Sequence, residues 1–400
     1  MDYGLGSYGI LREESFCMRV VHIIERIDSS YGGPAVSLPL FLKSLDELHV
    51  DSEVWSVSMD SNVDNKLLHD FEVNFSVFRR SFGRYLSLAL VYKVLLSCVK
   101  RDVDIFHFHS VWSSPTWFGM FLCRIFKVPY VLSPRSSLYD KSLQKRRALK
   151  SLLSVLFLKS LISKCEFVHC TDDEEERDVL RFCNCRTIVI PHGVDLPGES
   201  HRQSSSSEEL TKMDFGLRSI LYCSRIHPRK NLHIAIEAFA SSGLARLGWK
   251  FLVAGPVDDR VYFNSISQYI DKNSLHNNVV FLGMVVEPEK SLLYEYCDVF
   301  ILLSSFENFG MSIAEAIVSN SYVIISKNTP WSNLEQYGVG CSCEIDASEV
   351  ANALLEYCSI NPDREGGRIG DYEGYIRDNC ILWDDVAMKF ESEYRRIYES

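Results

Sequence analysis

Short apolar runs alternate with longer segments of helical periodicity along most of the chain. Apolar runs of strand length lie at 18–27, 52–58, 103–109, 129–133, 166–169 and 187–190, and again at 219–224, 250–255, 279–282, 299–303 and 322–326. Apolar positions with helical spacing follow several of these runs, as at 85–100 and from Met311 onward. This alternation favours an α/β fold with buried parallel strands. Thr171 and Glu174 predict a capping box at the start of one helix.

The two groups of strands predict two Rossmann-like domains. A chain of 400 residues exceeds one ordinary core. Residues 196–214 (LPGESHRQSSSSEELTKMD) are polar, rich in serine and without periodicity, which is typical of a linker. We therefore expect domains at 18–195 and 215–380. Residues 1–17 form a tail, and 381–400 carry a final amphipathic helix at 383–398.

Charge and composition narrow the class of protein. A hydrophobic content of 46% and a charged content of 24% are those of a soluble globular protein. The net charge of −11 argues against a general nucleic-acid binder. Residues 1–190 hold 24 of the 42 basic and 23 of the 53 acidic residues, so this half carries +1 and the other half −12.

The cysteines and the termini predict a reduced, cytoplasmic protein. Thirteen cysteines include no CxxC pair, and two C-x-C pairs lack a second cluster at zinc-finger spacing, so we expect no structural metal. The amino-terminal stretch lacks the basic and apolar regions of a signal peptide, and no apolar run has transmembrane length. Residues 4–9 match G-x-G-x-x-G, but no strand precedes them, so a dinucleotide site is not predicted.

The segment 299–318 combines a predicted strand, a loop and a helix. Glu307 lies in the loop, and Glu315 lies about one turn into the helix. The backbone amides of residues 309–312 lie between them, at a helix start that favours an anion. The segment thus offers a carboxylate for a sugar hydroxyl, amides for a diphosphate and a second carboxylate for a ribose. The alternative is a solvated loop acid and a surface helix acid.

Further candidate residues follow other predicted strands. Gly32 and Gly33 allow a ligand to approach the backbone, or form an ordinary tight turn. His109 ends the strand at 103–109, and period-two alternation places His107 on the same face of that strand. His109 either faces a ligand or is a core histidine. Arg225 and Lys230 follow the strand at 219–224, either solvated or as cations that stabilise a leaving diphosphate.

These segments resemble the motifs of glycosyltransferase family 4, a retaining group with the GT-B fold. The resemblance covers about residues 18–398. Its segments are the glycine loop at 32–33, H-F-H at 107–109, P-H-G-V-D at 191–195, R-I-H-P-R-K-N-L at 225–232 and E-N-F-G-M-S-I-A-E at 307–315. It implies an α/β, GT-B architecture with two Rossmann-like domains facing across a cleft. The first domain would bind the acceptor, the second would bind the nucleotide sugar, and the last helix would pack back on the first.

The resemblance also implies a role for each candidate residue. Glu307 would hold sugar hydroxyls beside the anomeric carbon, His109 would contact the transferred sugar, and Glu315 would bind the ribose. Met284 would adjoin the base. The diphosphate would be held by Gly32, Gly33, Arg225, Lys230 and the amides of Phe309, Gly310 and Met311. Because these groups supply the positive charge, we expect no cofactor and no metal, with a UDP-sugar or GDP-sugar as donor.

Two departures from the family pattern bear on the acceptor. Arg135 and Ser136 stand where many relatives have His-Gly, and Asn308 follows the first glutamate. The E-N-F-G form, with Thr-Pro-Trp331 downstream, resembles bacterial transferases of capsule, exopolysaccharide and O-antigen assembly. This implies a saccharide acceptor linked to a lipid. The competing hypotheses are a catalytically silent GT-B scaffold and a nucleotide-sugar 2-epimerase.

A basic stretch at 141–165 predicts contact with a membrane. It contains seven basic residues, no acid and interleaved leucines. We expect an anionic membrane surface, or the acceptor, to contact Lys141, Lys145, Arg146, Arg147 and Lys150. The alternative is a solvated basic helix. The predicted location is the inner face of the cytoplasmic membrane, where the protein would be peripheral.

Overall fold

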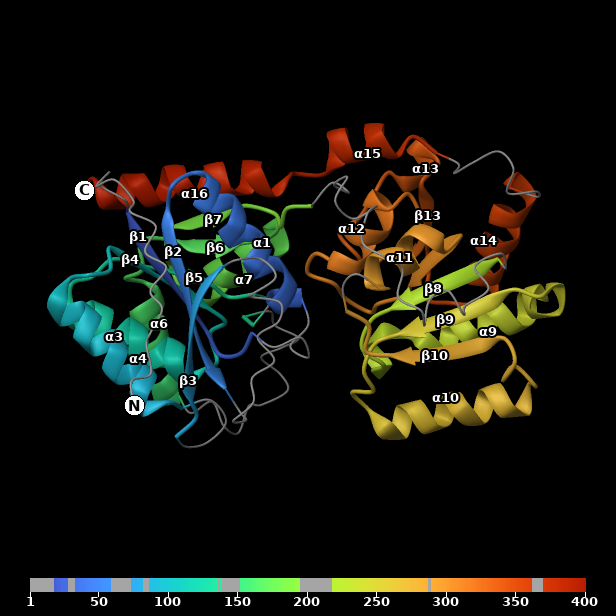
Figure 1. Cartoon of the computed structure of the whole chain (residues 1–400), viewed down its shortest axis with the longest axis horizontal. Coiled ribbons are helices and arrows are strands. Elements are labelled where there is room, and N and C mark those ends of the chain that lie inside the picture. The colour runs from blue at the N-terminus through green and yellow to red at the C-terminus, as the bar shows by residue number, and fades with distance from the viewer. Residues whose placement is uncertain are drawn as a thin grey trace, which may run out of the picture.

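The computed structural model describes residues 18–27, 33–58, 73–81, 86–135, 137–138, 152–194, 218–286, 289–361 and 370–400. Two parallel β-sheets, each with helices packed against it, lie side by side (Figure 1). The predicted tail at 1–17 and linker at 196–214 lie outside the described residues.

Within the described residues, the first sheet has seven strands in the order β3-β2-β1-β4-β5-β6-β7, and every pair of neighbours is parallel. Its strands are β1 Arg19–Ile24, β2 Asp51–Ser58, β3 Asn74–Arg79, β4 Ile105–His109, β5 Tyr130–Ser133, β6 Val168–Cys170 and β7 Thr187–Val189. Its helices are α1 Gly33–Glu47, α3 Leu88–Lys100, α4 Ser114–Phe126, α6 Leu152–Ile162 and α7 Asp173–Phe182. The strand order reverses between β1 and β4, and ligands of open parallel sheets bind at the carboxyl ends of the strands at such a point.

The second sheet, as far as the structure describes it, has six parallel strands in the order β10-β9-β8-β11-β12-β13, with the reversal between β8 and β11. Its strands are β8 Ser219–Cys223, β9 Lys250–Ala254, β10 Val279–Gly283, β11 Val299–Leu302, β12 Tyr322–Ser326 and β13 Gly340–Cys343. Its helices are η3 Pro228–Lys230, α9 Leu232–Ser242, η4 Leu244–Leu247, α10 Arg260–Lys272, α11 Glu289–Tyr296, α12 Met311–Val318, α13 Leu334–Tyr337, α14 Ala347–Ile360 and α15 Tyr372–Asn379.

The last helix, α16 Trp383–Tyr398, returns to the first sheet and packs beside α1, as predicted (Figure 1). Its buried residues recur at helical spacing: Trp383, Val386, Ala387, Phe390, Tyr394 and Ile397. They join Val20, Leu38 and Phe41 in one of the two apolar cores of this half. Because the apolar stripe cannot be left in water, its burial ties the end of the chain to the first sheet.

Three details of the sequence analysis differ from the structure. The strands β3 and β13 were not predicted: the side chains of β3 are exposed or half-buried, and Gly340–Cys343 (GCSC) lacks a strand-like apolar pattern. The cap of α7 is Asp172 rather than Thr171, and its side chain accepts a hydrogen bond from the amide of Glu175 at 2.8 Å. The buried Glu175 in turn accepts from both the amide and the hydroxyl of Thr171.

Within the residues that the structure describes, no helix has the length and apolar character needed to cross a membrane. The cysteines of these residues are free thiols.

Candidate active site

Lys230 and Glu307 meet at the reversal point of the second sheet. The chain after β8 forms η3, which ends at Lys230, and the chain after β11 carries Glu307. The Lys230 ammonium donates to the Glu307 carboxylate, which also accepts from the hydroxyl of Ser304 at 2.7 Å. Their side chains are 17% and 13% exposed, so this pair is largely shielded from water.

A neighbouring amide side chain fastens the two loops to each other. Asn231, at φ 51°, donates through its side chain to the carbonyl of Leu303 at 2.8 Å and to the hydroxyl of Ser305 at 3.0 Å. The amide of Ser305 donates to the carbonyl of Arg229 at 2.8 Å. These bonds fix the distance between the end of η3 and the β11 loop. Lys230 is therefore held beside Glu307 by the backbone as well as by charge.

Helix α12 begins beside this pair at Gly310, which has φ 83° and no side chain to cap the first amides. A Cβ at this position would lie 2.9 Å from Cδ1 of Ile313, so a larger residue would be strained as well as crowded. Trp331 donates its indole N–H to the carbonyl of Phe309 and holds the turn in place. The predicted diphosphate contacts of Phe309, Gly310 and Met311 thus lie at an uncapped helix start, which favours an anion.

Glu315 lies one turn along α12 and binds two side chains of α11. Lys290 forms an ion pair with one carboxylate oxygen, and the hydroxyl of Tyr294 donates to the other at 2.9 Å. Lys290 and Tyr294 were not singled out in the sequence. The acid is thereby held in one orientation, although its predicted contact with a ribose stays a prediction.

The other predicted donor residues have different surroundings. Arg225 lies in the loop after β8 and pairs with Asp258 at 3.0 Å, and its side chain is 52% exposed. Met284 follows the carboxyl end of β10 and is exposed. Gly33 is the first residue of α1, whereas Gly32 lies outside the described residues. The basic residues Lys141, Lys145, Arg146, Arg147 and Lys150 also lie outside them.

His109 lies at the carboxyl end of β4 and is buried, with both ring nitrogens in hydrogen bonds. Arg135 donates to Nδ1 at 3.1 Å, and Nε2 lies 3.1 Å from Nδ1 of His22. Because a guanidinium can only donate, Nδ1 of His109 is the acceptor and Nε2 carries the proton. The proton on Nε2 is therefore donated to His22. In this arrangement neither nitrogen of His109 is directed at a ligand, and its contact with a sugar stays a prediction.

A second chain of hydrogen bonds crosses the first sheet from α16. Tyr394 donates to Nδ1 of His107 at 2.6 Å, and His107 lies 2.7 Å from the hydroxyl of Ser133. Ser133 donates to Nδ1 of His169 at 2.8 Å, and His169 donates to the carbonyl of Ile190 at 2.7 Å. The carbonyl can only accept, so the direction of every bond in the chain is fixed. Both histidines are neutral in this arrangement.

Burial explains why the histidines of this cluster remain neutral. It lowers the pKa of His22 to about 3 and that of His169 to about 4. Burial also lowers the pKa values of His107 and His109 well below the usual range, and the Arg135 cation acts in the same direction. A charged imidazole would lose its hydration here, so the neutral form is favoured.

Two groups of residues bear on metal binding. Ring nitrogens of His22, His107 and His109 all lie within 4.8 Å of one another. The hydrogen bonds already described and the Arg135 cation beside His109 oppose a metal ion there. The sequence also contains one Asp-x-Asp, at Asp102 and Asp104, which precedes β4 at its amino end, away from the carboxyl edge. Asp104 accepts from the amide of Arg19 at 2.8 Å, which is a structural contact.

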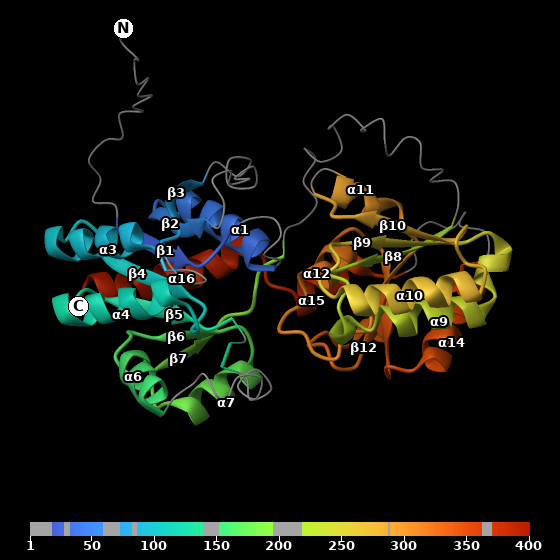
Figure 2. The ribbon, with the colours of Figure 1, turned by 90° about the horizontal axis from the view of Figure 1, so that it is seen from below.

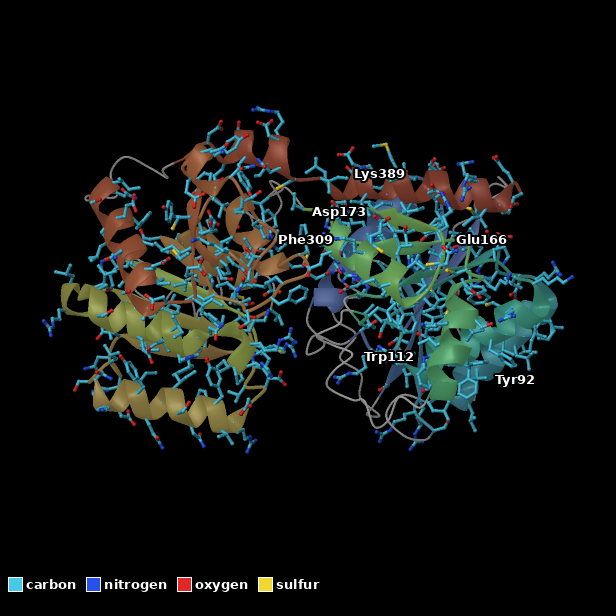
Figure 3. The ribbon with its side chains drawn as sticks, turned by 180° about the vertical axis from the view of Figure 1, so that it is seen from behind. Tyr92, Trp112, Glu166, Asp173, Phe309 and Lys389 are labelled. Carbon is cyan, nitrogen blue, oxygen red and sulfur yellow. The ribbon has the colours of Figure 1, made fainter. Side chains whose placement is uncertain are left out.

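The loops of the two halves also meet at this site. The side chain of Asn308 donates to the hydroxyl of Thr171 at 2.6 Å. The ring of Phe309 lies 5.6 Å from that of His192 and 5.2 Å from that of Trp331. Figure 3 shows Phe309 where the second half faces the first, and Asp173 at the start of α7 opposite it. The loops after β6 and β11 therefore bound the site from opposite sides.

Comparison with known proteins identifies related sequences for both halves. The family model described as "Glycosyltransferase Family 4" matches residues 31–197, and that described as "Glycosyl transferases group 1" matches residues 212–365. Alpha-monoglucosyldiacylglycerol synthase of Streptococcus pneumoniae is 25% identical over 71% of this chain, and the match spans 63% of that relative's length. O-antigen chain mannosyltransferase C of Escherichia coli is 22% identical over 96% of this chain and 100% of its own.

Solved structures with the same two-sheet arrangement confirm the GT-B fold. Anabaena HepE in complex with UDP and glucose has a TM-score of 0.73 at 19% identity, covering 94% of this chain and 98% of that one. Sucrose-phosphate synthase from Thermosynechococcus elongatus has a TM-score of 0.70 at 16% identity, covering 96% and 99%. At these identities the likeness concerns the fold alone.

Proposed function

Because this chain belongs to the group 1 glycosyltransferases of family 4, we propose that it transfers a sugar from a nucleotide-diphosphate sugar to a lipid-linked saccharide, with retention and without a metal. The observation that carries the proposal is the Lys230–Glu307 pair at the reversal point of the second sheet. The Lys230 cation and the uncapped start of α12 match the diphosphate of such a donor, and the Glu307 carboxylate matches its sugar.

The donor would replace part of the present pairing. Its diphosphate would take the ammonium of Lys230 and the first amides of α12, with Arg225 nearby in the same loop. Glu307 would then be released to accept from sugar hydroxyls, while Glu315 would hold the ribose and Met284 the base. UDP-sugars and GDP-sugars both fit this description. Anabaena HepE has been solved with UDP-glucose, which makes UDP-glucose the first donor to test.

The chemical step would depend on charge stabilisation at the leaving group. Breaking the bond between the anomeric carbon and the diphosphate oxygen places negative charge on that oxygen, where a fixed cation and amides lower the barrier. In the proposed front-face reaction, the acceptor hydroxyl oxygen bonds to the anomeric carbon, and its proton passes to the departing phosphate oxygen. Glu307 would orient the sugar and stabilise the oxocarbenium-like centre, without forming a covalent bond.

The acceptor proposal rests on the relatives and on the E-N-F-G form of the motif. One relative is named as a glucosyldiacylglycerol synthase and another as an O-antigen chain mannosyltransferase. Both names describe products built on membrane lipids or on surface polysaccharide. We therefore propose a role in surface polysaccharide assembly, peripheral to the cytoplasmic membrane, with residues 141–150 as one contact to the membrane or the acceptor.

A panel of nucleotides and nucleotide sugars, without metal, tests the proposal. A ligand present at about 100 times its Kd stabilises the folded protein by about 2.7 kcal/mol, which is visible as a thermal shift. The stabilising donor would then be incubated with lipid-linked oligosaccharide, and the anomeric configuration of the product would be read by NMR. A protein that binds no nucleotide sugar would be a scaffold, and one that isomerises donor without acceptor would be an epimerase.

A further inference from the structure

Three helices on one side of the first sheet expose apolar side chains to solvent. Helices α3, α4 and α6 lie in a row along the outer side of this half (Figure 2). Arg124 of α4 donates to the carbonyl of Ser160 in α6 at 3.1 Å, and the rings of Phe121 and Phe157 lie 5.8 Å apart. The helix face α3–α4–α6 is defined by its exposed large apolar residues: Leu88, Tyr92, Val99, Phe118, Phe121, Ile125 and Phe157.

The exposed apolar residues of α4 form a continuous stripe. Phe118, Phe121 and Ile125 follow one another at spacings of three and four, so they point to the same side of the helix. They are 44%, 40% and 54% exposed. On α3, Tyr92 and Val99 are 61% and 59% exposed. A group of this size on adjacent elements marks an interaction surface rather than scattered surface residues.

The charges of the same three helices have one sign. The segments 88–101, 114–127 and 152–165 contain no aspartate or glutamate. They do contain seven basic residues: Lys93, Lys100, Arg101, Arg124, Lys127, Lys159 and Lys164. On the other side of the first sheet, α16 carries both signs of charge: the acids Asp384, Asp385, Glu391 and Glu393 and the basic residues Lys389, Arg395 and Arg396. Figure 3 shows the positions of the two surfaces, with Tyr92 on α3 and Lys389 on α16 at opposite limits of the first half.

Most of the described apolar side chains of α6 are buried in the protein and do not contribute to the exposed apolar surface. Leu158, Leu161 and Ile162 lie in the core of the first half, so these residues of the predicted membrane helix face the protein. Phe157 is the exposed exception among the described side chains of α6. The apolar groups available to a partner therefore come mainly from α3 and α4, which precede the predicted basic stretch in the chain.

We propose that the helix face α3–α4–α6 is the surface by which this protein docks on an anionic lipid bilayer. Aromatic and aliphatic side chains would enter the boundary between headgroups and acyl chains, and the basic side chains would contact anionic headgroups. A second copy of the chain fits less well, because two such faces would bring like charges together. The inference deepens the proposed function, since a lipid-linked acceptor requires the enzyme at the membrane.

The topology brings the docked face to the carboxyl edge of the first sheet, whose loop after β6 bounds the site through Thr171. In a parallel sheet, each helix begins at the carboxyl ends of the strands, so α4 begins just beyond His109. A bilayer along α4 would thus extend to the edge where Arg135 and His109 lie. An acceptor anchored in that bilayer would reach the site without leaving the membrane, while the second half faces the aqueous donor.

Vesicle flotation with the full chain tests this proposal. Vesicles containing phosphatidylglycerol and phosphatidylcholine in equal amounts serve as the anionic probe, and pure phosphatidylcholine as the neutral one. The variant Phe118→Ser/Phe121→Ser/Ile125→Ser should bind the anionic vesicles at least about tenfold more weakly than wild type. Leu247→Ser/Val261→Ser is the matched control, because both residues are exposed in the second half, at 76% and 82%. It should float as wild type does.

A charge variant and the salt dependence of flotation test the electrostatic part of docking. Lys100→Gln/Lys127→Gln, at two exposed positions, should weaken binding to anionic vesicles, and added salt should have the same effect on wild type. If the triple serine variant floats as wild type does, the proposal is overturned. The proposal is also overturned if flotation is lost only when Lys141, Lys145, Arg146, Arg147 and Lys150 are replaced by Gln. A dimer that the triple serine variant converts to monomer, without vesicle binding, would assign the face to a second copy.

The proposed reaction is checked separately, because hydrolysis of a nucleotide sugar in solution does not need the bilayer. The triple serine variant should hydrolyse donor as wild type does and lose only transfer to acceptor in vesicles. Absence of donor hydrolysis in wild type would count against the proposed function and leave flotation as an independent result. Equal transfer to vesicle-bound acceptor by both proteins would overturn the docking surface.

Discussion

Lys230 and Glu307 form an ion pair across the reversal point of the second sheet, with each side chain less than one-fifth exposed. The two residues are 77 positions apart in the chain, and the hydrogen bonds of Asn231 to the β11 loop hold them together. Without a donor, Glu307 neutralises the charge of the Lys230 ammonium, and a bound diphosphate would become the new partner of that ammonium. In the proposed reaction, the pair would therefore link donor binding to release of the carboxylate that orients the sugar.

Removing the cation of this pair should abolish most of the activity. Lys230→Ala should lower turnover by about 10²–10³-fold, because the leaving diphosphate loses a preorganised positive charge. The control is Lys327→Ala, since Lys327 pairs with Glu344 on the surface of the same half, and exposed pairs contribute little. Initial rates of donor hydrolysis with both variants measure the effect. Near-native turnover by Lys230→Ala would refute the assignment.

Chelation should leave the activity unchanged. The positive charge at the predicted diphosphate site comes from Lys230, Arg225 and the amides of α12, and Asp104 of the single Asp-x-Asp is engaged with Arg19. Transfer measured after dialysis against excess EDTA should therefore match that of untreated enzyme. A loss of rate that Mn²⁺ or Mg²⁺ restores would show that the charge supplied by the protein is insufficient.

The attachment of α16 to the first sheet should depend on one hydroxyl. Tyr394→Phe leaves Nδ1 of the buried His107 without its donor, which should lower the free energy of unfolding by about 1–3 kcal/mol. Tyr398→Phe on the same helix is the control, because Tyr398 is exposed and should change stability by less than about 0.5 kcal/mol. Urea denaturation compares the two. Equal stabilities would mean that the hydroxyl contributes nothing to the attachment.

Stability should fall as the pH drops from about 6.5 toward 4. The pKa values of His22, His107, His109 and His169 are lowered in the fold, so the unfolded chain binds protons in this range and the folded chain does not. Each histidine should cost about 1.4 kcal/mol of unfolding free energy per pH unit below 6.5, and nothing above it. Urea midpoints at pH 7.5 and 5.5 measure the slope.

A stability that is flat between pH 7.5 and 5.5 would show that the cluster takes up protons without unfolding. The hydrogen-bond directions derived from Arg135 and from the carbonyl of Ile190 would then be wrong.

Local patterns in the sequence predicted the strands that are buried on both faces and the loops that follow them. The apolar run before Glu307 and the helical spacing after Met311 appear as β11 and α12, with Glu307 and Gly310 in the intervening loop. The final helix was also predicted from its periodicity, and the family resemblance implied that it packs on the first domain. Such features depend on a few neighbouring residues, whose periodicity and charge are visible without long-range contacts. Strands β3 and β13 lack that periodicity, and their pairing to neighbours decides their conformation.

The sequence by itself determined the family, the fold and several candidate site residues, among them Lys230, Glu307 and Glu315, because motif spacing and alternation are properties of the sequence alone. Only the tertiary structure decided how those residues are paired. It placed Lys230 on Glu307, enclosed His109 between Arg135 and His22, and turned Leu158 and Leu161 of the basic stretch into the core. It also brought 88–101, 114–127 and 152–165 together as one face without acids. Burial and pairing depend on residues distant in the chain, and local sequence does not encode which distant residues will meet.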